Sequence, residues 1–583
     1  MISRLTLRNF KSVGEQVYDF TQFDLLVGRN NSGKSTVLQA LAIWQFCVDE
    51  FHRSKRRGSK GIQVVLPNFT ALPVPEFNLL WKDKTARHWP MVEGKKKQTY
   101  ILIDIIVDWV GAGGVAYSFG VALRYHSPHA IYAIPVEGWT VFRDLEQGQL
   151  LPRIAYVPPF SGLEPSEEWR DDGPLRKQVG KAQPGSVLRN LLYRVCPAME
   201  EVKTIEVSKF RITQPPKAWR EIGEVIQRWF DVSLSAPRYQ TGVDTQITVQ
   251  YRQHDKDFDI IAGGSGFHQT LTLLGFLHGY KPTTILLDEP DAHLHVNLQR
   301  EILDYFKQKS LETGTQFLIA THAEEFARGV DASQIISLLA QVPKRIQSTP
   351  DVLRAMSLVS NEEITRLMAH PYILYVEGES DERILRSWTA QCSAQTAMDK
   401  ICFKRMGGGG KENMNEKANE HFAALKHIIP SVSRLMLFDY DDHAEWHPSA
   451  NNPAVFEWKR KNIENYLLVP DTWVRATLQH LQYGHDELIA QPIIQMINDF
   501  FASENLTLPP GQTWRSVRAN VFSVVDGKRI LFENDHSLFQ QLRKTKPSVQ
   551  LIREQVAMSM EADEIHDDVH SFIAKLADMT RSQ

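Results

Sequence analysis

The stretch from Leu25 to Leu38, LLVGRNNSGKSTVL, constrains the fold more than any other part of the chain. Its apolar start is typical of a buried strand, and the residues after Ser35 continue with the spacing of an amphipathic helix. Between strand and helix lie two glycines, Gly28 and Gly33, followed by Lys34. This is the P-loop pattern, in which glycines let successive backbone N–H groups turn inward and cradle phosphate oxygens. The sequence therefore predicts an α/β domain built around a nucleotide.

The residue types in this loop predict how a nucleoside triphosphate would be held. The Lys34 ammonium can reach the β- and γ-phosphates, and the Ser35 hydroxyl can bind Mg²⁺. The N-terminus of the helix adds positive potential. A glycine-rich turn before an ordinary helix is the alternative, but it leaves the lysine, the serine and the flanking strand unexplained. The residues expected to bind ATP are Gly28, Asn30, Asn31, Gly33, Lys34, Ser35 and Thr36.

Length and composition limit the kinds of protein that this chain can be. A chain of 583 residues is too long for one core and predicts several domains. The formal net charge is −3, so any contact with nucleic acid must come from local basic patches. The most apolar stretch, residues 100–110, contains two aspartates and is too short to span a bilayer. The cysteines lack the spacing of a metal site. Together these features predict a cytoplasmic protein that is not embedded in a membrane.

Two later strands predict the catalytic side of the nucleotide site. Residues 284–291, TILLDEPD, form a buried strand that ends in Asp288 and Glu289. Ligands of open α/β sheets bind at the carboxyl ends of strands, so Asp288 can hold Mg²⁺ while Glu289 orients or deprotonates water. The next apolar strand, 316–320, is followed closely by His322. A lone histidine is usually structural, but its place at this strand end predicts a sensor of the γ-phosphate.

A second glycine-rich turn completes a recognisable series. Residues 262–269, AGGSGFHQ, lead into an apolar helix whose N-terminus could face a phosphate. The order P-loop, GSGxxQ, LLDEP and ATH resembles the ABC-type ATPases, specifically the SMC-like and RecF-like branch. The resemblance implies that two heads sandwich ATP, with Ser265 and Gly266 of one head facing the γ-phosphate bound to the other, and with Asp291 in the D-loop. It therefore implies a homo-oligomer, a dimer or a tetramer. The glutamine of the family's Q-loop is not found near residues 156–162.

The rest of the N-terminal region predicts additions to this ATPase fold. Residues 98–109, 115–124 and 130–136 have strand character and suggest an antiparallel β section. From about 170 to 240 the spacing of apolar residues is helical, which predicts a helical insertion between two ATPase segments. No heptad run approaches the length of a coiled-coil arm. The ATPase domain is expected to cover residues 1–369.

Three strand ends in the C-terminal region predict a metal site. Residues 372–381, YILYVEGESD, contain a strand that ends at Glu377, and residues 435–441, LMLFDYD, contain one that ends at Asp439 and Asp441. A third strand, 401–406, is followed by four glycines. Carboxylates meeting at one edge of a sheet suit Mg²⁺ or Mn²⁺, which prefer oxygen ligands. The alternative is three unrelated acidic turns.

The series VEGxSD, GGGG and DxD resembles a TOPRIM domain, the metal-dependent module of topoisomerases, primases and some nucleases. The resemblance makes Glu377, Asp439 and Asp441 the catalytic acids and adds Asp381 as a metal ligand. Residues 459–468, KRKNIENYLL, are similar to the segment after DxD in nucleases of the OLD (overcoming lysogenisation defect) family. That similarity makes Glu464 a candidate metal ligand or supporting acid. The later sequence VDGKRIL supplies Lys528 as a candidate for stabilising transition-state charge.

An ABC-type ATPase domain followed by a TOPRIM domain with a helical C-terminal part, expected at 370–583, is the domain order of the OLD family. This resemblance implies an ATP- and Mg²⁺- or Mn²⁺-dependent nuclease that cleaves DNA in bacterial anti-phage defence, similar to Gabija-type or retron-associated effectors. Such effectors can require a neighbouring-gene partner, for example a helicase or a reverse transcriptase with its RNA and DNA. Two alternatives stay open: an ATP-gated DNA clamp or repair mediator with an inactive TOPRIM fold, and a nuclease that cleaves tRNA or other RNA.

Overall fold

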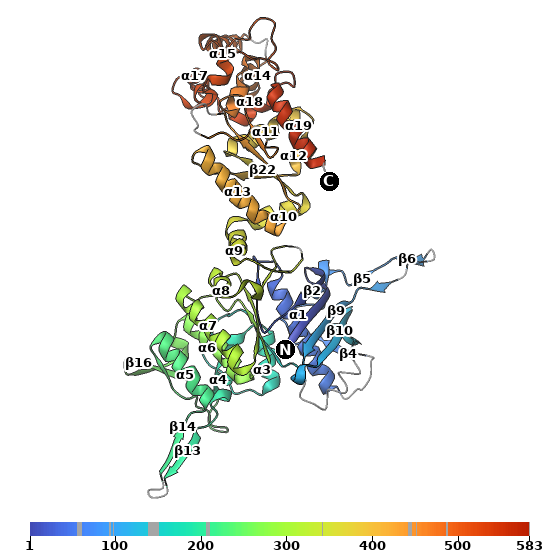
Figure 1. Ribbon diagram of the computed structural model, residues 1–583, viewed down its shortest axis with the longest axis vertical. Helices are drawn as coiled ribbons and strands as arrows, with labels where there is room; N and C mark the ends of the chain where they lie inside the picture. The colour runs from blue at the N-terminus through green and yellow to red at the C-terminus, as the bar shows by residue number, and fades with distance from the viewer. Residues whose placement is uncertain are drawn as a thin grey trace. The chain divides into compact units, whose positions relative to one another are not determined.

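The computed structural model describes residues 1–54, 61–92, 95–96, 98–137, 151–205, 210–340, 342–440, 446–449, 452–484 and 488–581. The chain divides into two compact units, Met1–Leu353 and Arg354–Gln583 (Figure 1). Both units combine helices with sheets, which confirms the expected α/β class. The boundary expected between residues 369 and 370 falls inside the second unit, between α10 (Asn361–Ala369) and β22 (Tyr372–Val376).

The first unit contains an antiparallel sheet that starts at the N-terminus. Its first strand alternates in character, so Ile2, Leu5 and Leu7 are fully buried while the side chains between them are not. The antiparallel β section expected after residue 98 belongs to this sheet. In spatial order its strands are β2 (Val13–Asp19), β1 (Ile2–Phe10), β9 (Ile103–Val110), β10 (Ala116–Ser127), β11 (Ala130–Glu137) and β4 (Ile62–Val65).

A second sheet of the first unit holds the P-loop strand in its interior. Every residue of this strand, β3, is buried, as expected for a strand covered on both faces. The strands from β12 to β20 run parallel, so the carboxyl ends of β3, β18 and β19 meet at one edge. In spatial order the strands are β12 (Ile154–Val157), β18 (Thr284–Asp288), β19 (Gln316–Thr321), β3 (Phe23–Val27), β20 (Ile335–Ser337) and β21 (Lys344–Arg345).

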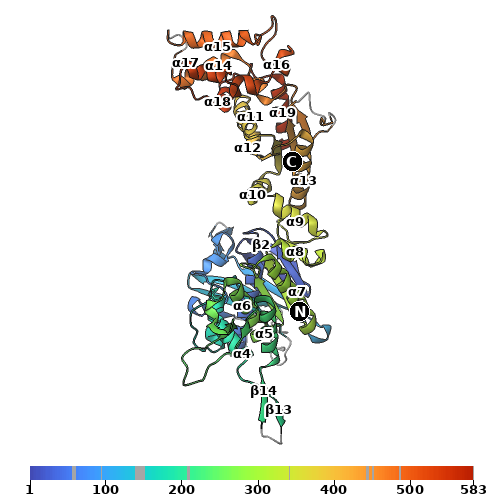
Figure 2. The ribbon, with the colours of Figure 1, turned by 90° about the vertical axis from the view of Figure 1, so that its left-hand side faces the viewer.

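The insertion expected to be helical between about 170 and 240 also contains a β-hairpin, formed by β13 (Glu200–Ile205) and β14 (Phe210–Gln214). The purely helical expectation was wrong here, because the β-branched residues in EEVKTI and FRITQ favour paired strands. Figures 1 and 2 both show this hairpin extending away from the body of the first unit. The helices of this unit are α1 (Lys34–Arg53), α3 (Asp172–Gly180), α4 (Leu188–Val195), α5 (Lys217–Phe230), α6 (Ser265–Tyr280), α7 (Val296–Thr313) and α8 (Glu324–Arg328).

Short strands complete the first unit. One set forms a three-stranded sheet ahead of α6, and two small hairpins precede β9. The three-stranded sheet contains β15 (Ser233–Leu234), β16 (Gln250–Gln253) and β17 (Lys256–Asp259); the hairpins pair β5 (Arg87–His88) with β8 (Thr99–Tyr100) and β6 (Met91–Val92) with β7 (Lys95–Lys96).

The most apolar stretch of the chain forms a strand. Most of residues 100–110 belong to β9, whose Trp109 packs edge-on against Trp44 of α1 with ring centroids 5.8 Å apart. The stretch therefore contributes to the core of the first unit. Within the described ranges, no helix is both long enough and apolar enough to cross a membrane.

The second unit is built on a parallel four-stranded sheet. Its strands are, in spatial order, β23 (Ile401–Arg405), β22, β24 (Ser433–Phe438) and β25 (Val455–Glu457). Aromatic packing supports the fold, since Trp458 contacts both Tyr466 and Phe572 with ring centroids 5.0 and 5.3 Å away. The helices are α9 (Thr349–Leu358), which spans the division between the units, α10, α11 (Glu379–Gln391), α12 (Gln395–Asp399), α13 (Lys411–Ile428), α14 (Pro470–Leu481), α15 (Gln491–Ser503), α16 (Val521–Val524), α17 (Leu538–Thr545), α18 (Arg553–Met558) and α19 (Asp567–Arg581).

A single buried amide joins the two large sheets of the first unit. The side chain of Gln316, at the start of β19, is fully buried. Its Nε2 donates to the carbonyls of Ile2 and Thr21, both at 2.7 Å, and its Oε1 accepts from the Ile2 N–H at 2.8 Å. The Thr284 hydroxyl donates to the same oxygen at 3.0 Å. The side chain of Gln316 therefore forms hydrogen bonds with the backbone of β1, while its own backbone belongs to β19 beside β18.

Replacing this amide tests its contribution to the fold. Gln316→Leu keeps the approximate volume but leaves several buried polar groups unpaired, so it should lower the free energy of unfolding of the first unit by about 3 kcal/mol. Hydrogen exchange in peptides of β1 and β19 measures this loss. The control is Gln308→Leu, which removes only the exposed hydrogen bond to Glu312 and should change stability by less than about 0.5 kcal/mol. If peptides of β1 and β19 are equally protected from hydrogen exchange in both variants, the role of Gln316 is contradicted.

Candidate nucleotide and metal sites

The P-loop has the backbone geometry of a phosphate cradle. Gly33 has φ 94° and Asn31 has φ 65°, both in the left-handed region. A Cβ on Gly28 would lie 2.4 Å from the Ser32 hydroxyl oxygen, so a side chain here would have to displace Ser32. The Lys34 ammonium donates to the carbonyls of Gly28 and Arg29 at 2.8 and 2.9 Å. This places a buried cation inside the loop, where burial lowers the pKa of Lys34 while nearby carboxylates oppose that change.

A buried carboxylate connects the P-loop helix to the acidic strand end. The Ser35 hydroxyl donates to Asp288 Oδ1 at 2.8 Å, and the Tyr156 hydroxyl donates to Asp288 Oδ2 at 3.0 Å. Burial raises the pKa of Asp288, and the two hydroxyls counteract it. Burial and the Asp288 charge likewise raise the pKa of Tyr156, so the phenol keeps the proton that it donates. A serine hydroxyl beside an aspartate is the donor set that Mg²⁺ uses in P-loop enzymes.

The remaining catalytic candidates lie at the same edge of the sheet. Glu289 follows β18 with φ 52°, a left-handed conformation that is rare for a residue with a Cβ, and its N–H donates to the Ala320 carbonyl at 2.8 Å. The His322 Nδ1 lies 3.6 Å from Glu289 Oε1. Strain of this kind often accompanies functional positions. The carboxylate and the imidazole can therefore act on one atom between them.

These residues surround one open cavity of about 590 Å³. The structure thus brings together the P-loop and the two strand ends that the sequence predicted, with Asp288 and Gly28 bonded to the lining residues Ser35 and Lys34. The predicted residues that line the cavity are Asn30, Asn31, Gly33, Lys34, Ser35, Thr36, Glu289 and His322.

Sequence reasoning missed four residues of this site. Lys11 and Ser12 line the cavity from the turn between β1 and β2, and Gln39 lines it from the second turn of α1. The Lys11 ammonium donates to the Gln39 amide oxygen, and burial lowers the pKa of Lys11. Tyr156 is the fourth, through its bond to Asp288. A positive φ of 51° at Lys11 marks a tight turn, but the sequence carries no sign that this turn faces the P-loop.

Ser265 and Gly266 do not belong to this cavity in the same chain. They begin α6, where Ser265 is exposed, and among the described residues that line the P-loop cavity neither is present. The helix is nevertheless tied to the acidic strand end, because the Gln269 amide donates to the Pro290 carbonyl at 2.7 Å. Asp291 Oδ1 accepts from the Thr321 hydroxyl at 2.6 Å, which fixes the adjoining turn. The exposed N-terminus of α6 is thus free to face another molecule.

In the second unit, two of the three predicted core acids lie together. Glu377 Oε1 accepts from the backbone N–H of Asp439 at 2.9 Å, and Asp439 Oδ1 accepts from the N–H of Ile463 at 3.1 Å. Burial raises the pKa of Asp439 well above its ordinary value, and the charges of Glu377, Asp381 and Glu464 raise it further. Four carboxylates therefore share one region at the carboxyl edge of the sheet. Asp441 lies outside the described residues.

We call the four carboxylates Glu377, Asp381, Asp439 and Glu464 the acidic cluster. One arginine and one lysine lie near it. Arg553 Nε donates to the buried Glu464 at 2.7 Å and its Nη2 donates to Glu533 at 2.9 Å. The exposed Lys528 ammonium lies 3.7 Å from Glu533 Oε1 and exerts its charge on Asp381. Arg553 was not predicted from the sequence.

The acidic cluster fits the chemistry of Mg²⁺ or Mn²⁺ but is not a closed metal site by itself. Within the described ranges, no three His, Cys, Asp or Glu side chains are arranged so that they could hold a metal ion. Asp381 accepts from the Gly378 N–H at 2.9 Å and Glu464 is engaged by Arg553, so both already have partners. The donor set is nevertheless all carboxylate oxygen, which these cations prefer.

Comparison with protein families identifies the first unit. Residues 1–53 match the model described as AAA ATPase domain, and residues 209–326 match the model described as AAA domain, putative AbiEii toxin, Type IV TA system. The first match contains the P-loop, and the second contains Ser265, the Asp288–Glu289 pair and His322. The first unit therefore contains an AAA-type ATPase domain. The cavity described above is its candidate ATP site, and both matches lie in the first unit.

Solved structures similar to the chain include heads of SMC proteins. One is the SmcHead bound to the C-winged helix domain of ScpA, at 16% identity, covering 58% of this chain and 94% of that one, with a TM-score of 0.34. Others are the SMC head domain from Thermotoga maritima (15%, 58% and 94%, TM-score 0.29) and the Smc head domain with an extended coiled coil bound to the C-terminal domain of ScpA derived from Pyrococcus furiosus (14%, 59% and 95%, TM-score 0.32). No curated protein matches the chain.

The geometry of the ATPase domain separates nucleotide binding from hydrolysis. Lys34→Ala removes the cation inside the P-loop and should weaken ATP binding at least about tenfold. Glu289→Gln keeps the shape of the strand end, so it should bind ATP normally but hydrolyse it about 10²- to 10⁴-fold more slowly, the usual contribution of a positioned base. Nucleotide binding and phosphate release are measured for both variants. Normal turnover by Glu289→Gln would show that another group acts on the water.

Proposed function

We propose that the chain is an ATP-dependent nuclease in which the ATPase domain controls metal-dependent phosphodiester cleavage by the second unit. The observation that carries this proposal is the acidic cluster, in which Asp439 is buried beside Glu377 at the carboxyl edge of a parallel sheet. The resemblance of this region to TOPRIM domains, and of the domain order to the OLD family, supports the same reading. A purely structural cluster would give no reason to bury so many like charges.

The roles within the cluster follow from the contacts of each carboxylate. Glu377 and Asp439, with Asp441 by resemblance, would hold Mg²⁺ or Mn²⁺, and Asp381 would complete the set. When bound, these ions supply polarisation of the scissile phosphate and activation of water. Glu464 keeps Arg553 beside the cluster through their 2.7 Å bond. Arg553 and Lys528 provide positive charge that can stabilise the phosphorane-like charge of the transition state.

In the ATPase domain, Lys34 would hold the phosphates, while Ser35 and Asp288 would bind Mg²⁺. Glu289 would act on the attacking water, and His322 would contact the γ-phosphate. The exposed Ser265 and the adjoining Gly266 would complete the ATP site of a second copy, with Asp291 in the turn beside them. This arrangement requires a homo-oligomer, a dimer or a tetramer.

We take DNA as the expected target and defence against phage as the expected setting, on the resemblance to Gabija-type and retron-associated effectors. A neighbouring-gene partner, such as a helicase or a reverse transcriptase with its nucleic acid, belongs to the same inference. Cleavage of tRNA or other RNA uses the same chemistry, so substrate panels must contain both nucleic acids. A DNA clamp with an inactive second unit is the alternative function.

Two variants, each expected to lose ATP hydrolysis by itself, test whether the ATP site is shared between subunits. Ser265→Glu places a carboxylate where the neighbouring γ-phosphate would lie, while an acidic residue in the first turn suits the helix. Gly266 is less suitable for substitution, because its Cβ would lie 3.3 Å from the His293 carbonyl. Ser265→Glu should retain ATP binding and lose at least about 90% of hydrolysis.

Mixing Ser265→Glu with Lys34→Ala provides the decisive measurement. Each mixed dimer would contain one site with both changes and one site with neither, so part of the ATPase activity should return. Subunit exchange is verified by a tag on one variant. If the exchanged mixture stays inactive, the signature loop does not act across subunits.

The nuclease assignment is tested at Asp439. Asp439→Asn keeps the side-chain shape and the bond from the Ile463 N–H but removes one of the clustered charges. We expect at least a 100-fold loss of cleavage over a panel of plasmid, linear DNA, single strands, tRNA and total RNA with Mg²⁺ or Mn²⁺. Without metal the variant should melt at a higher temperature than the parent, because repulsion is relieved, and added metal should stabilise it less.

The matched control is Asp499→Asn. It changes an exposed acid of α15 that accepts a hydrogen bond from Gln495. This change should leave cleavage, melting and its metal dependence as in the parent. ATP hydrolysis should persist in both variants, since its metal is held by the ATPase domain. Cleavage by Asp439→Asn at the parental rate would refute the active site. A parent that cuts nothing in the panel, with any required partner present, would favour the clamp.

A further inference from the structure

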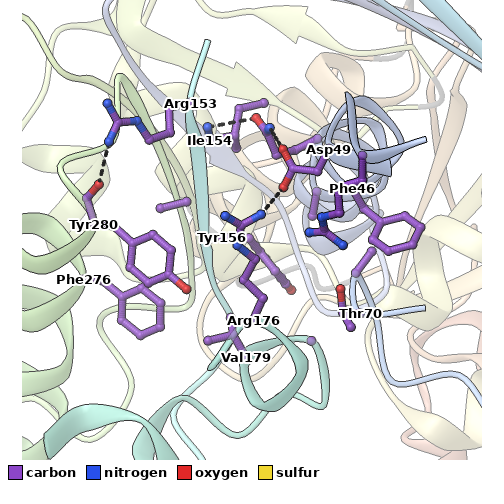
Figure 3. Close-up of a pocket in the computed structure, with 16 residues that line it drawn as sticks. Phe46, Asp49, Thr70, Arg153, Ile154, Tyr156, Arg176, Val179, Phe276 and Tyr280 are labelled. Carbon is purple, nitrogen blue, oxygen red and sulfur yellow. Dashed lines mark hydrogen bonds and ion pairs between the residues drawn. The ribbon is translucent and has the colours of Figure 1, made fainter. Parts of the chain in front are cut away.

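A second cavity lies in the ATPase domain, at the end of α1 away from the P-loop (Figure 3). Its volume is about 150 Å³. One wall is the face of α1 that carries Phe46 and Asp49, spaced three apart so that both side chains point the same way. The other walls come from β12, from Arg176 and its neighbours on α3, and from Phe276 and Tyr280 of α6.

The interior of this cavity is aromatic. The Phe276 and Tyr280 rings stack with centroids 5.6 Å apart and planes 7° apart. Figure 3 shows Phe46 on the opposite side, so that aromatic surfaces bound the space from two directions. An apolar cavity of about this volume holds a benzene molecule in another protein. The space therefore suits one six-membered ring.

The charge around the cavity favours an anion. Three guanidinium groups line it, those of Arg53, Arg153 and Arg176, whereas Asp49 is the one carboxylate among its described lining residues. Arg53 is already paired with Glu50 of its own helix. Arg176 already donates to Asp49, so these two charges offset each other. The exposed Arg153 guanidinium donates to a neutral group, the Tyr280 carbonyl at 3.5 Å. Cationic charge therefore remains at the rim for a carboxylate or a similar group.

The walls of the cavity lead directly to the ATP site. Helix α1 begins at Lys34 in the P-loop, and α6 begins at Ser265, so the far ends of both helices meet here. Tyr156 links the two sites most closely, because it lines the cavity and its hydroxyl donates to Asp288 Oδ2 at 3.0 Å. A ring that packs against Tyr156 would hold the phenol, and with it the Asp288 carboxylate, in one orientation.

We propose that this cavity binds a small aromatic anion and that the bound anion strengthens the binding of Mg²⁺ and ATP through Tyr156. The ring occupies the space between Phe46 and the Phe276–Tyr280 pair, and the anionic group contacts Arg153. The cavity thus gives the ATPase domain an effector site distinct from the nucleotide cavity. The inference concerns ATP binding alone and does not depend on the nuclease activity.

Three isosteric probes test binding to the full-length chain: benzoate, neutral benzamide and cationic benzamidine. Benzoate should bind with a Kd on the order of 1 mM, as expected for so few atoms, and at least about fivefold more tightly than the other two. Ligand-observed NMR measures the three affinities at constant ionic strength. Arg153→Glu should weaken benzoate at least about fivefold, since only its exposed side chain changes and its backbone bonds to Thr283 remain. The control Arg238→Glu changes an exposed arginine away from the cavity and should leave the affinity for benzoate unchanged.

Coupling is tested by titrating Mg²⁺ and ATP with and without saturating benzoate. Benzoate should lower the Kd for ATP at least about twofold, and by reciprocity ATP should tighten benzoate by the same factor. In Tyr156→Phe benzoate should still bind, but the change in the Kd for ATP should disappear. Equal binding of all three probes, or benzoate binding that Arg153→Glu leaves intact, would overturn the site. Unchanged ATP affinity in the parent, or coupling that survives in Tyr156→Phe, would overturn the effector role.

Discussion

The ATPase domain depends on one buried carboxylate, that of Asp288. Its two oxygens accept from Ser35 on the P-loop helix and from Tyr156 on β12, residues that are far apart in the chain. Because burial disfavours its charge, the Asp288 carboxylate depends on the hydrogen bonds from both hydroxyls. The phosphate loop, the acidic strand end and β12 are therefore held in one arrangement.

The parallel order of β18, β19 and β3 makes this arrangement possible. Three loops leave the same edge of the sheet, so an acid, a histidine and the P-loop converge although separate segments supply them. Gln316 maintains that edge from the opposite end, since it joins β19 to the antiparallel sheet through β1. The same strands, β18 and β19, therefore contribute both to the stability of the fold and to the arrangement of the candidate catalytic residues.

The second unit repeats this design with a different balance of charge. Its parallel sheet again delivers acids at one edge, but here Glu377, Asp439 and Glu464 are near enough to disfavour one another's charge. Arg553 offsets part of this repulsion. The candidate ATP cavity, by contrast, is lined by Lys34 and Lys11 together with one described acid, Glu289. The first site thus combines cations with an acid, whereas acids predominate in the second.

The sequence by itself determined the P-loop, the acidic strand ends and the α/β class, because each depends on residues adjacent in the chain and on a local apolar pattern. It also placed Glu377 and Asp439 at strand ends. Only the tertiary structure decided which side chains meet across the fold. Tyr156 and Asp288 are 132 positions apart, Arg553 and Glu464 are 89 apart, and strand order rather than local spacing brings them together. The β-hairpin β13–β14 was missed for a related reason: each of its strands is too short to show a clear period before it pairs with the other.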